Sequence, residues 1–315
     1  ASHSTSATLI AGASGNRLAP LRITTPGDLG LDYWFSVPAM PFGIWRSDEP
    51  DPYRPANTWV SLLDATTVLS LTDDSYTEPL PLGFRFPFGN EDYETVTVHS
   101  NGVLILGKPR DLNGFSTTCA GARETLNGAI FPLRTDLDPS HGGQVRAGQV
   151  GNRFVVTYDD VPLHSSDPDD DSNPAPRYTF QVVLAPDGHI RFAYRDIGDL
   201  PEYVSFGTQR GIDDANVLGC GADIPITSTL TLALHRQPDA TEWLELVDET
   251  SGSIAPGSEV VVPLRMRWIA GSSERPYRGT ILIESNDIDQ AQMRLPVELF
   301  AEPITYHTWL PYLQR

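Results

Sequence analysis

PLGFRFPFGNEDYETVTVHSNGVLILG, running from Pro81 to Gly107, decides the fold class of this chain. Apolar and polar residues alternate, break at a Gly-Asn pair, alternate again, break at an Asn-Gly pair and resume. Successive side chains of a strand point to opposite faces, so Leu82, Phe84, Phe86 and Phe88 are predicted to share one face. The stretch therefore predicts consecutive antiparallel strands.

The Asn-Gly pair at 101–102 predicts a two-residue hairpin loop. A type I′ turn needs positive φ at both central positions, and Asn-Gly is the pair that supplies it most readily. Such a turn would pair His99 with Leu104 and Val98 with Ile105.

Strand-like runs continue through most of the chain, and no run with a 3.6-residue period reaches helical length. The fold class predicted is all-β: a larger antiparallel β-sandwich, then a small one, with an extended N-terminal arm and a short C-terminal tail. The expected boundaries are 1–56 for the arm, 57–237 for the larger sandwich, 238–302 for the smaller sandwich and 303–315 for the tail.

The composition of the chain disfavours several classes of function. The 315 residues carry a formal charge of −19, which disfavours nucleic acid and anionic membrane surfaces as partners. The 26 Gly and 27 Pro residues suit short strands joined by turns. No apolar run reaches the roughly 18 residues of a membrane span. The Ser/Thr-rich start at Ala1 is expected for an exported protein whose signal peptide has been removed.

Cys119 and Cys220 form no CxxC pair, so a metal or redox motif is not expected. In an exported protein the default is one disulfide between them. Two buried free thiols are the alternative.

Motifs for catalysis are missing from the sequence. It contains no GxSxG, no HExxH and no P-loop. We therefore expect no enzymatic activity, although a glycosidase-type carboxylate pair stays open in a chain with 41 acidic residues.

One acidic run resembles a calcium loop, and no other cofactor is expected. Its oxygen-bearing residues fall at alternate positions, as in the first half of an EF-hand: Asp167, Asp169, Asp171 and Asn173. Ser172 replaces the usual glycine and Tyr178 the bidentate glutamate, so a solvated acidic loop is the alternative. Further candidate oxygen ligands are Asp73, Asp74, Asp136 and Asp138, which could instead cap turns.

Four motifs resemble the bacterial relatives of the nidogen-like extracellular domain. They are the stretch from Asp73 to Gly107, AIFPLRTDLDP at 129–139, NRFVVTYDDVP at 152–162 and YTFQVVLAPDGHIRFAY at 178–194. This resemblance implies that the larger sandwich is nidogen-like.

Downstream, IAPGSEVVVPLRM, YRGTILIESNDID and RLPVELF are similar to small immunoglobulin-like modules of secreted bacterial proteins. The ending HTWLPYLQR resembles a tail found on secreted proteins of some filamentous bacteria. Together the resemblances imply an exported, non-catalytic role in adhesion or structure.

The function predicted is that of an extracellular or cell-surface structural protein that polymerises with itself. An extended arm can add a strand to the sheet edge of a neighbouring copy, which would give a filament or another surface polymer. The alternative is that the arm folds back on its own chain. The arm residues expected to make the contact are Leu9, Ile10, Arg17, Leu21, Arg22 and Ile23.

Aromatic residues near the ends suggest a second function, that of an adhesin or a carbohydrate- or protein-binding accessory module. Trp34, Trp45 and Trp309 are the candidate contact residues. Their rings could stack on sugar, cover sandwich edges or pack at a subunit contact.

Overall fold

The computed structural model confirms the all-β class. The residues that it describes are 5–7, 16–24, 30–56, 58–61, 66–108, 126–165, 172, 174–211, 214–221, 226–247, 250–269, 275–287 and 291–299. The chain divides into two compact units, which we call the terminal unit (Ala1–Gly43 with Gln237–Arg315) and the central unit (Ile44–Arg236). The central unit is therefore an insertion between two parts of the terminal unit.

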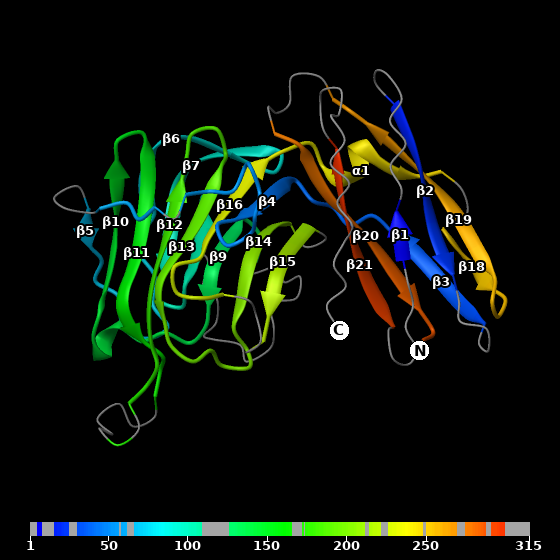
Figure 1. Cartoon of the computed structure of the whole chain (residues 1–315). Coiled ribbons are helices and arrows are strands. Elements are labelled where there is room, and N and C mark those ends of the chain that lie inside the picture. The colour runs from blue at the N-terminus through cyan, green and yellow to red at the C-terminus, as the bar shows by residue number, and fades with distance from the viewer. Residues whose placement is uncertain are drawn as a thin grey trace. The chain divides into compact units, whose positions relative to one another are not determined.

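The central unit contains a seven-stranded antiparallel sheet in the order β4-β16-β13-β12-β11-β10-β5 (Figure 1). The APDG sequence forms the turn between β12 and β13, where Gly188 N donates to Ala185 O at 2.9 Å. The strands of this sheet are β4 (Phe42–Arg46), β5 (Thr67–Val68), β10 (Gln144–Val150), β11 (Arg153–Pro162), β12 (Arg177–Leu184), β13 (Ile190–Ile197) and β16 (Thr231–Arg236).

The second sheet of the central unit has six strands in the order β15-β14-β9-β8-β7-β6. Buried tyrosines of the first sheet reach across to it. Tyr158 donates to His99 O at 2.5 Å, and Tyr194 donates to Pro132 O at 2.6 Å. The strands are β6 (Leu80–Phe88), β7 (Glu91–His99), β8 (Val103–Leu106), β9 (Ala129–Arg134), β14 (Ser205–Gly211) and β15 (Asp214–Cys220).

The predicted face of β6 is confirmed, since Leu82, Phe86 and Phe88 are buried and Phe84 is half-buried. The predicted β7–β8 register is wrong by one residue. His99 pairs with Val103, so the loop holds three residues, and within it only Gly102 has positive φ, at 70°. A three-residue loop ending in a left-handed glycine is the next commonest hairpin connection.

The terminal unit is built from two four-stranded sheets, β1-β2-β19-β17 and β18-β3-β20-β21. Residues from both sheets form one hydrophobic cluster, so the sheets pack face to face. The elements are β1 (Thr5–Ala7), β2 (Asn16–Thr24), β3 (Leu31–Ser36), the short helix α1 (Ala240–Trp243), β17 (Leu244–Leu246), β18 (Ser251–Ile254), β19 (Glu259–Arg267), β20 (Tyr277–Ser285) and β21 (Gln292–Leu299).

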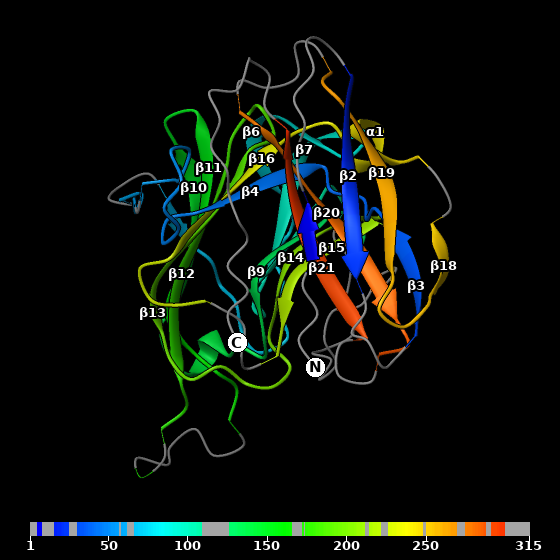
Figure 2. The same ribbon diagram turned by 45° about the vertical axis from the view of Figure 1, so that its right-hand side comes forward.

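The expected boundaries of the arm and the smaller sandwich differ from the structure. Figures 1 and 2 show the blue strands β2 and β3 beside the orange strands of the C-terminal part, with β2 next to β19 and β3 next to β20. β2 pairs with β19 along nine residues, from Asn16 opposite Arg267 to Thr24 opposite Glu259. In their described parts, residues 1–56 therefore supply strands to both units.

The core of the terminal unit explains why these N-terminal strands are needed. Leu21 and Ile23 of β2 are buried in the same cluster as Tyr33 and Phe35 of β3. Alternate residues of β19 line the same cluster, namely Val262, Leu264 and Met266, with Val260 packed against it. Without β2 and β3, the cluster would lose their four side chains, and more of the apolar surface of β19 and β20 would be open to water.

Among the described residues, no helix is both long and apolar enough to cross a membrane.

Candidate cation-binding site

Two loops meet at one end of the central unit because a short bridge joins them. Leu137, which follows β9, pairs with Leu163, which follows β11. Asp138 N donates to Pro162 O at 3.0 Å, and His164 N donates to the carbonyl of Asp136 at 2.7 Å. This bridge brings His164 beside the two aspartates of the Asp-Leu-Asp sequence.

The β7–β8 hairpin loop connects a third segment, the turn at Asp73 and Asp74, to the loop that follows β9. Asn101 is buried and makes two bonds: its Nδ2 donates to Asp74 Oδ1 at 2.7 Å, and its Oδ1 accepts from Leu137 N at 2.9 Å. Ser100 N donates to Ser75 O at 2.8 Å. The Ser-Asn-Gly loop therefore fixes the positions of both acidic segments.

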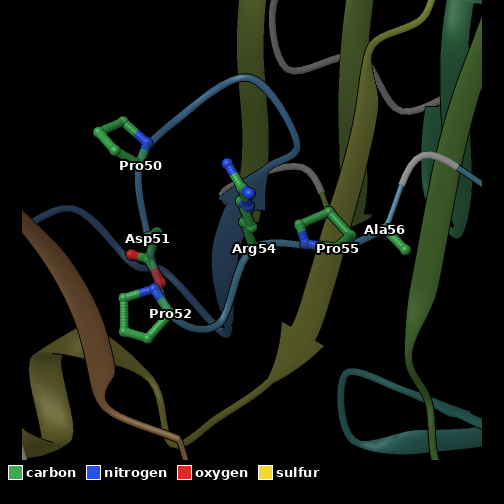
Figure 3. A pocket seen from close by; sticks show the side chains of 6 residues that line it. All are labelled: Pro50, Asp51, Pro52, Arg54, Pro55 and Ala56. Atoms are coloured by element: carbon green, nitrogen blue, oxygen red, sulfur yellow. The ribbon is translucent and has the colours of Figure 1, made fainter.

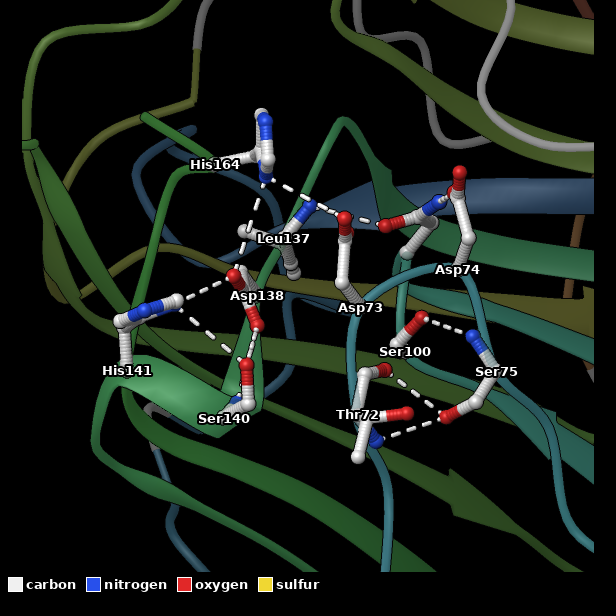
Figure 4. Close-up of polar contacts among 11 residues, drawn as sticks. Thr72, Asp73, Asp74, Ser75, Ser100, Leu137, Asp138, Ser140, His141 and His164 are labelled. Atoms are coloured by element: carbon white, nitrogen blue, oxygen red, sulfur yellow. Dashed lines mark hydrogen bonds and ion pairs between the residues drawn. The ribbon is translucent and has the colours of Figure 1, made fainter. Parts of the chain in front are cut away.

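Six side chains converge where these segments meet, and Figure 4 shows most of them. His164 Nδ1 lies 3.3 Å from Asp73 Oδ2 and 3.7 Å from Asp138 Oδ2. His141 Nδ1 lies 2.6 Å from Asp138 Oδ2. We call this group the Asp–His cluster: Asp73, Asp74, Asp136, Asp138, His141 and His164.

Burial, neighbouring charges and hydrogen bonds shift the pKa values of the carboxyl groups in the Asp–His cluster in different directions. Burial raises the pKa of Asp73, and the negative charges of Asp74 and Asp138 add to the rise. Burial likewise raises the pKa of Asp136. Burial opposes ionisation of Asp138 too, but hydrogen bonds from Ser140 and His141 together outweigh it and hold its pKa below the usual value. Asp138 is therefore the carboxylate best satisfied by the protein itself.

Two overlapping trios in the Asp–His cluster have the spacing of metal ligands. Asp73 belongs to both, once with Asp138 and His164 and once with Asp74 and Asp136, and the ligand atoms of each trio lie within 4.8 Å of one another. Two oxygens on opposite sides of one Ca²⁺ would be about that far apart, at about 2.4 Å each. The all-carboxylate trio suits a hard cation such as Ca²⁺, whereas the trio with histidine suits a transition metal.

Asp73 of the Asp–His cluster has an oxygen that no described residue satisfies. Its Oδ1 is shielded from solvent and accepts no hydrogen bond from the part of the chain that the structure describes. A buried carboxylate oxygen without a donor is costly unless a cation or an ordered water satisfies it.

The structure describes four of the eight predicted oxygen ligands. The four candidates beside turns, Asp73, Asp74, Asp136 and Asp138, come together in one place. The EF-hand-like residues Asp167, Asp169, Asp171 and Asn173 lie outside the described residues.

The histidines of the Asp–His cluster were not predicted. A weak signal precedes His141: Asp138 caps a short 3₁₀ helix (Pro139–His141) that has proline in its first turn and histidine in its last. His164 follows a strand in sequence and carries no such signal.

The predicted assembly residues of the arm lie mostly in the sheets of their own chain. Leu21 and Ile23 are buried, and Arg22 forms an ion pair with Glu259 of β19. Arg17 is paired with Met266 in the β2–β19 ladder. The remaining two, Leu9 and Ile10, are outside the described residues.

The predicted contact tryptophans differ from one another. Trp45 is 1% exposed and packs edge-on against His235, so its role as a surface contact is wrong. Trp34 is 51% exposed. Trp309 and Cys119 lie outside the described residues, and the disulfide to Cys220 stays a prediction.

A second candidate site is an open hollow in the Pro-rich segment 50–56 (Figure 3). Three proline rings line it together with Asp51, Arg54 and Ala56. The segment is held by its own backbone, with Arg54 N donating to Asp51 O at 3.1 Å. One acid and one base on an open loop do not form a converging set of ligands, so the Asp–His cluster is the stronger candidate.

Comparison with known proteins gives one result for the central unit. A family model described as NIDO related, that is, nidogen related, matches residues 53–240. No solved structure matches the chain. The match spans nearly all of the central unit and more than half of the chain, and the chain therefore belongs to the NIDO-related family.

Proposed function

We propose that this protein is a non-catalytic extracellular structural module that joins copies of itself by exchanging its N-terminal strand. Membership of the NIDO-related family supports an extracellular structural or binding role. The observation that carries the finer proposal is the place of β2, which enters its sheet from the N-terminal end of the chain and pairs with β19 along nine residues.

Exchange of β2 between copies would preserve every contact that it makes within one chain. Leu21 and Ile23 would fill the same core positions in a neighbour, and Arg22 would meet the neighbour's Glu259. If each chain gives its strand to the next and receives one from the previous chain, the contact is heterologous and builds a ring or an open filament. The opposite signs of Arg22 and Glu259 favour correct register.

A disulfide that locks β2 into its own sheet tests this proposal. Arg22 and Val261 face each other across β2 and β19, and opposite residues of antiparallel strands have Cα atoms about 4.5–5.5 Å apart, within disulfide range. In the double variant Arg22→Cys/Val261→Cys, oxidised as a monomer, we expect assembly to stop. Negative-stain images and sedimentation velocity measure the assembly.

The single variants Arg22→Cys and Val261→Cys, oxidised in the same way, are the matched controls and should assemble like the wild type. Polymers formed by the locked double variant would rule out strand exchange. A wild-type protein that stays monomeric at every concentration would rule out self-assembly altogether.

We also propose that the Asp–His cluster binds Ca²⁺ through Asp73, Asp74 and Asp136. The unsatisfied Asp73 Oδ1 and the raised pKa values of Asp73 and Asp136 support this, because a divalent cation would satisfy the oxygen and relieve the repulsion. Such an ion would tie the turn at Asp73 to the loop after β9.

Thermal unfolding with and without calcium checks this proposal. At about 100 times its Kd, a ligand of the native state adds about 2.7 kcal/mol to the free energy of unfolding. We expect calcium to raise the Tm of the wild type and EDTA to reverse the rise, whereas Asp73→Asn abolishes the response.

The control is Asp187→Asn, which alters a similar Asp–His pair at the β12–β13 turn, 2.7 Å from His189, and should leave the calcium response intact. An equal response in the Asp73→Asn variant would place calcium elsewhere.

A further inference from the structure

Trp34 is the largest exposed apolar side chain among the described residues, at 51% exposure. It lies on β3, an inner strand between β18 and β20. Its neighbours Tyr33 and Phe35 point into the core, so Trp34 projects from the outer face of the sheet. On one side of this indole lies the short edge strand β18, and on the other lie β20 and β21.

The surroundings of Trp34 follow from the strand register. Ser251 lies opposite it on β18, and Glu284 lies opposite it on β20. Asp32 and Ser36 precede and follow it on the same side of β3. We call this surface the Trp34 face: Asp32, Trp34, Ser36, Ser251, Glu284, Leu282, which lies opposite Ser36 on β20, and, one strand further, Arg294 of β21.

The make-up of the Trp34 face does not suit a dry contact with another protein. The centre of a protein interface is apolar and depleted of charge. Here hydroxyl and carboxylate groups flank the indole directly, and Leu282, the apolar residue nearest in register, is half-buried. An exposed indole ring surrounded by hydrogen-bonding groups instead suits a ligand whose flat faces are apolar and whose edges carry polar groups.

The charge of the chain and of the Trp34 face restricts the class of ligand further. The chain carries a formal charge of −19, which opposes an anionic polymer. On the Trp34 face itself, Asp32 and Glu284 are offset in part by Arg294. Asp32 accepts hydrogen bonds from Asn286 Nδ2, at 3.1 Å, and from Ser253 Oγ, whereas Glu284 accepts one from Gln292 Nε2, at 3.4 Å. A neutral ligand rich in hydroxyl groups complements this arrangement.

We propose that the Trp34 face binds a neutral β-linked polysaccharide of glucose or N-acetylglucosamine. In these sugars the substituents are equatorial, so each ring face presents C–H groups that can stack on the indole. The ring hydroxyls can donate to Glu284 and accept from Arg294. This binding site does not depend on strand exchange, since β3 stays in its sheet in either case.

Depletion from solution by insoluble cellulose and by insoluble chitin tests the proposal with the full chain. We expect the wild type to bind one of the two and to ignore immobilised heparin. Trp34→Ala should weaken binding at least about tenfold, because a buried aromatic anchor commonly contributes that much to an interface. Trp34→Phe should retain part of the affinity. Trp34 is exposed, so both variants should keep the wild-type Tm.

Val261→Ala is the matched control. Val261 is 43% exposed on β19, in the other sheet of the same unit, and its loss should leave binding unchanged. The proposal fails if the wild type binds neither polysaccharide or if Trp34→Ala binds like the wild type. It also fails if Trp34→Ala changes the sedimentation of the protein alone, since the face would then be a contact between copies.

Discussion

Deletion of residues 1–29 is expected to unfold the terminal unit and to leave the central unit folded. The deletion removes β2, and with it Leu21 and Ile23 from the core. Each of these side chains contributes about 1.5–3 kcal/mol by burial. The nine-residue ladder with β19 is lost as well. A domain has only about 5–15 kcal/mol of stability in total, so this loss is expected to abolish cooperative folding of the terminal unit.

Differential scanning calorimetry should show the loss directly. We expect the full chain to give one transition for each unit and the truncated chain to keep only the transition of the central unit. Hydrogen exchange should locate the loss in β19 and β20. A synthetic peptide of residues 16–24, added in excess, should restore protection to β19, because it can occupy the place of the missing strand.

The control is a shorter deletion, of residues 1–7. It removes β1, which contributes three pairs at the outer edge of β2, and the terminal unit should keep its transition. If the longer deletion also keeps that transition unchanged, β2 is not an integral strand of the terminal unit.

The all-β class could be predicted because alternation is a local signal. In β6 and β19 apolar residues recur at every second position over nine residues, and the structure buries the faces that this pattern predicts. The β12–β13 turn also follows from its Pro-Asp-Gly sequence.

The role of β2 and β3 could not be predicted in the same way. β2 contains Pro20 and offers few clear alternations, and β19, the strand with which it pairs, lies more than two hundred positions away. A domain inserted into another separates two halves that a linear reading of composition assigns to different regions. Residues 1–36 therefore resemble an arm when taken alone.

Only part of the Asp–His cluster could be predicted from the sequence, because the contacts that assemble it join distant segments. The four aspartates could be named as candidate oxygen ligands because they are acidic residues beside turns. Their convergence depends on the Leu137–Leu163 bridge and on the side chain of Asn101. Asn-Gly suggested a two-residue loop, but Asn101 is engaged by its side chain and Gly102 alone takes the left-handed backbone. Local turn preference could not reveal this tertiary bond.

Among the described glycines of the central unit, Gly102 is expected to be the one whose substitution by alanine is most damaging. Gly102 has φ of 70°, and an added Cβ would lie 1.9 Å from the carbonyl oxygen of Leu133. The left-handed backbone alone costs about 1–2 kcal/mol for an L-residue. Relief of the clash must move β9, where Leu133 is fully buried. We expect a total loss above about 4 kcal/mol, which is in the exceptional range for one substitution.

Gly151→Ala is the matched control, because Gly151 also lies in a hairpin turn, has φ of 63° and has no atom within 4 Å of an added Cβ. It should lose only the backbone term of about 1–2 kcal/mol. Denaturant midpoints of the central unit compare the two variants. Gly102→Ala should also abolish any calcium response, since the Asn101 bonds that position Asp74 and Leu137 depend on the same loop. Equal losses in the two variants would show that β9 yields to the added methyl group, and the hairpin loop would then not be the rigid support that the Asp–His cluster requires.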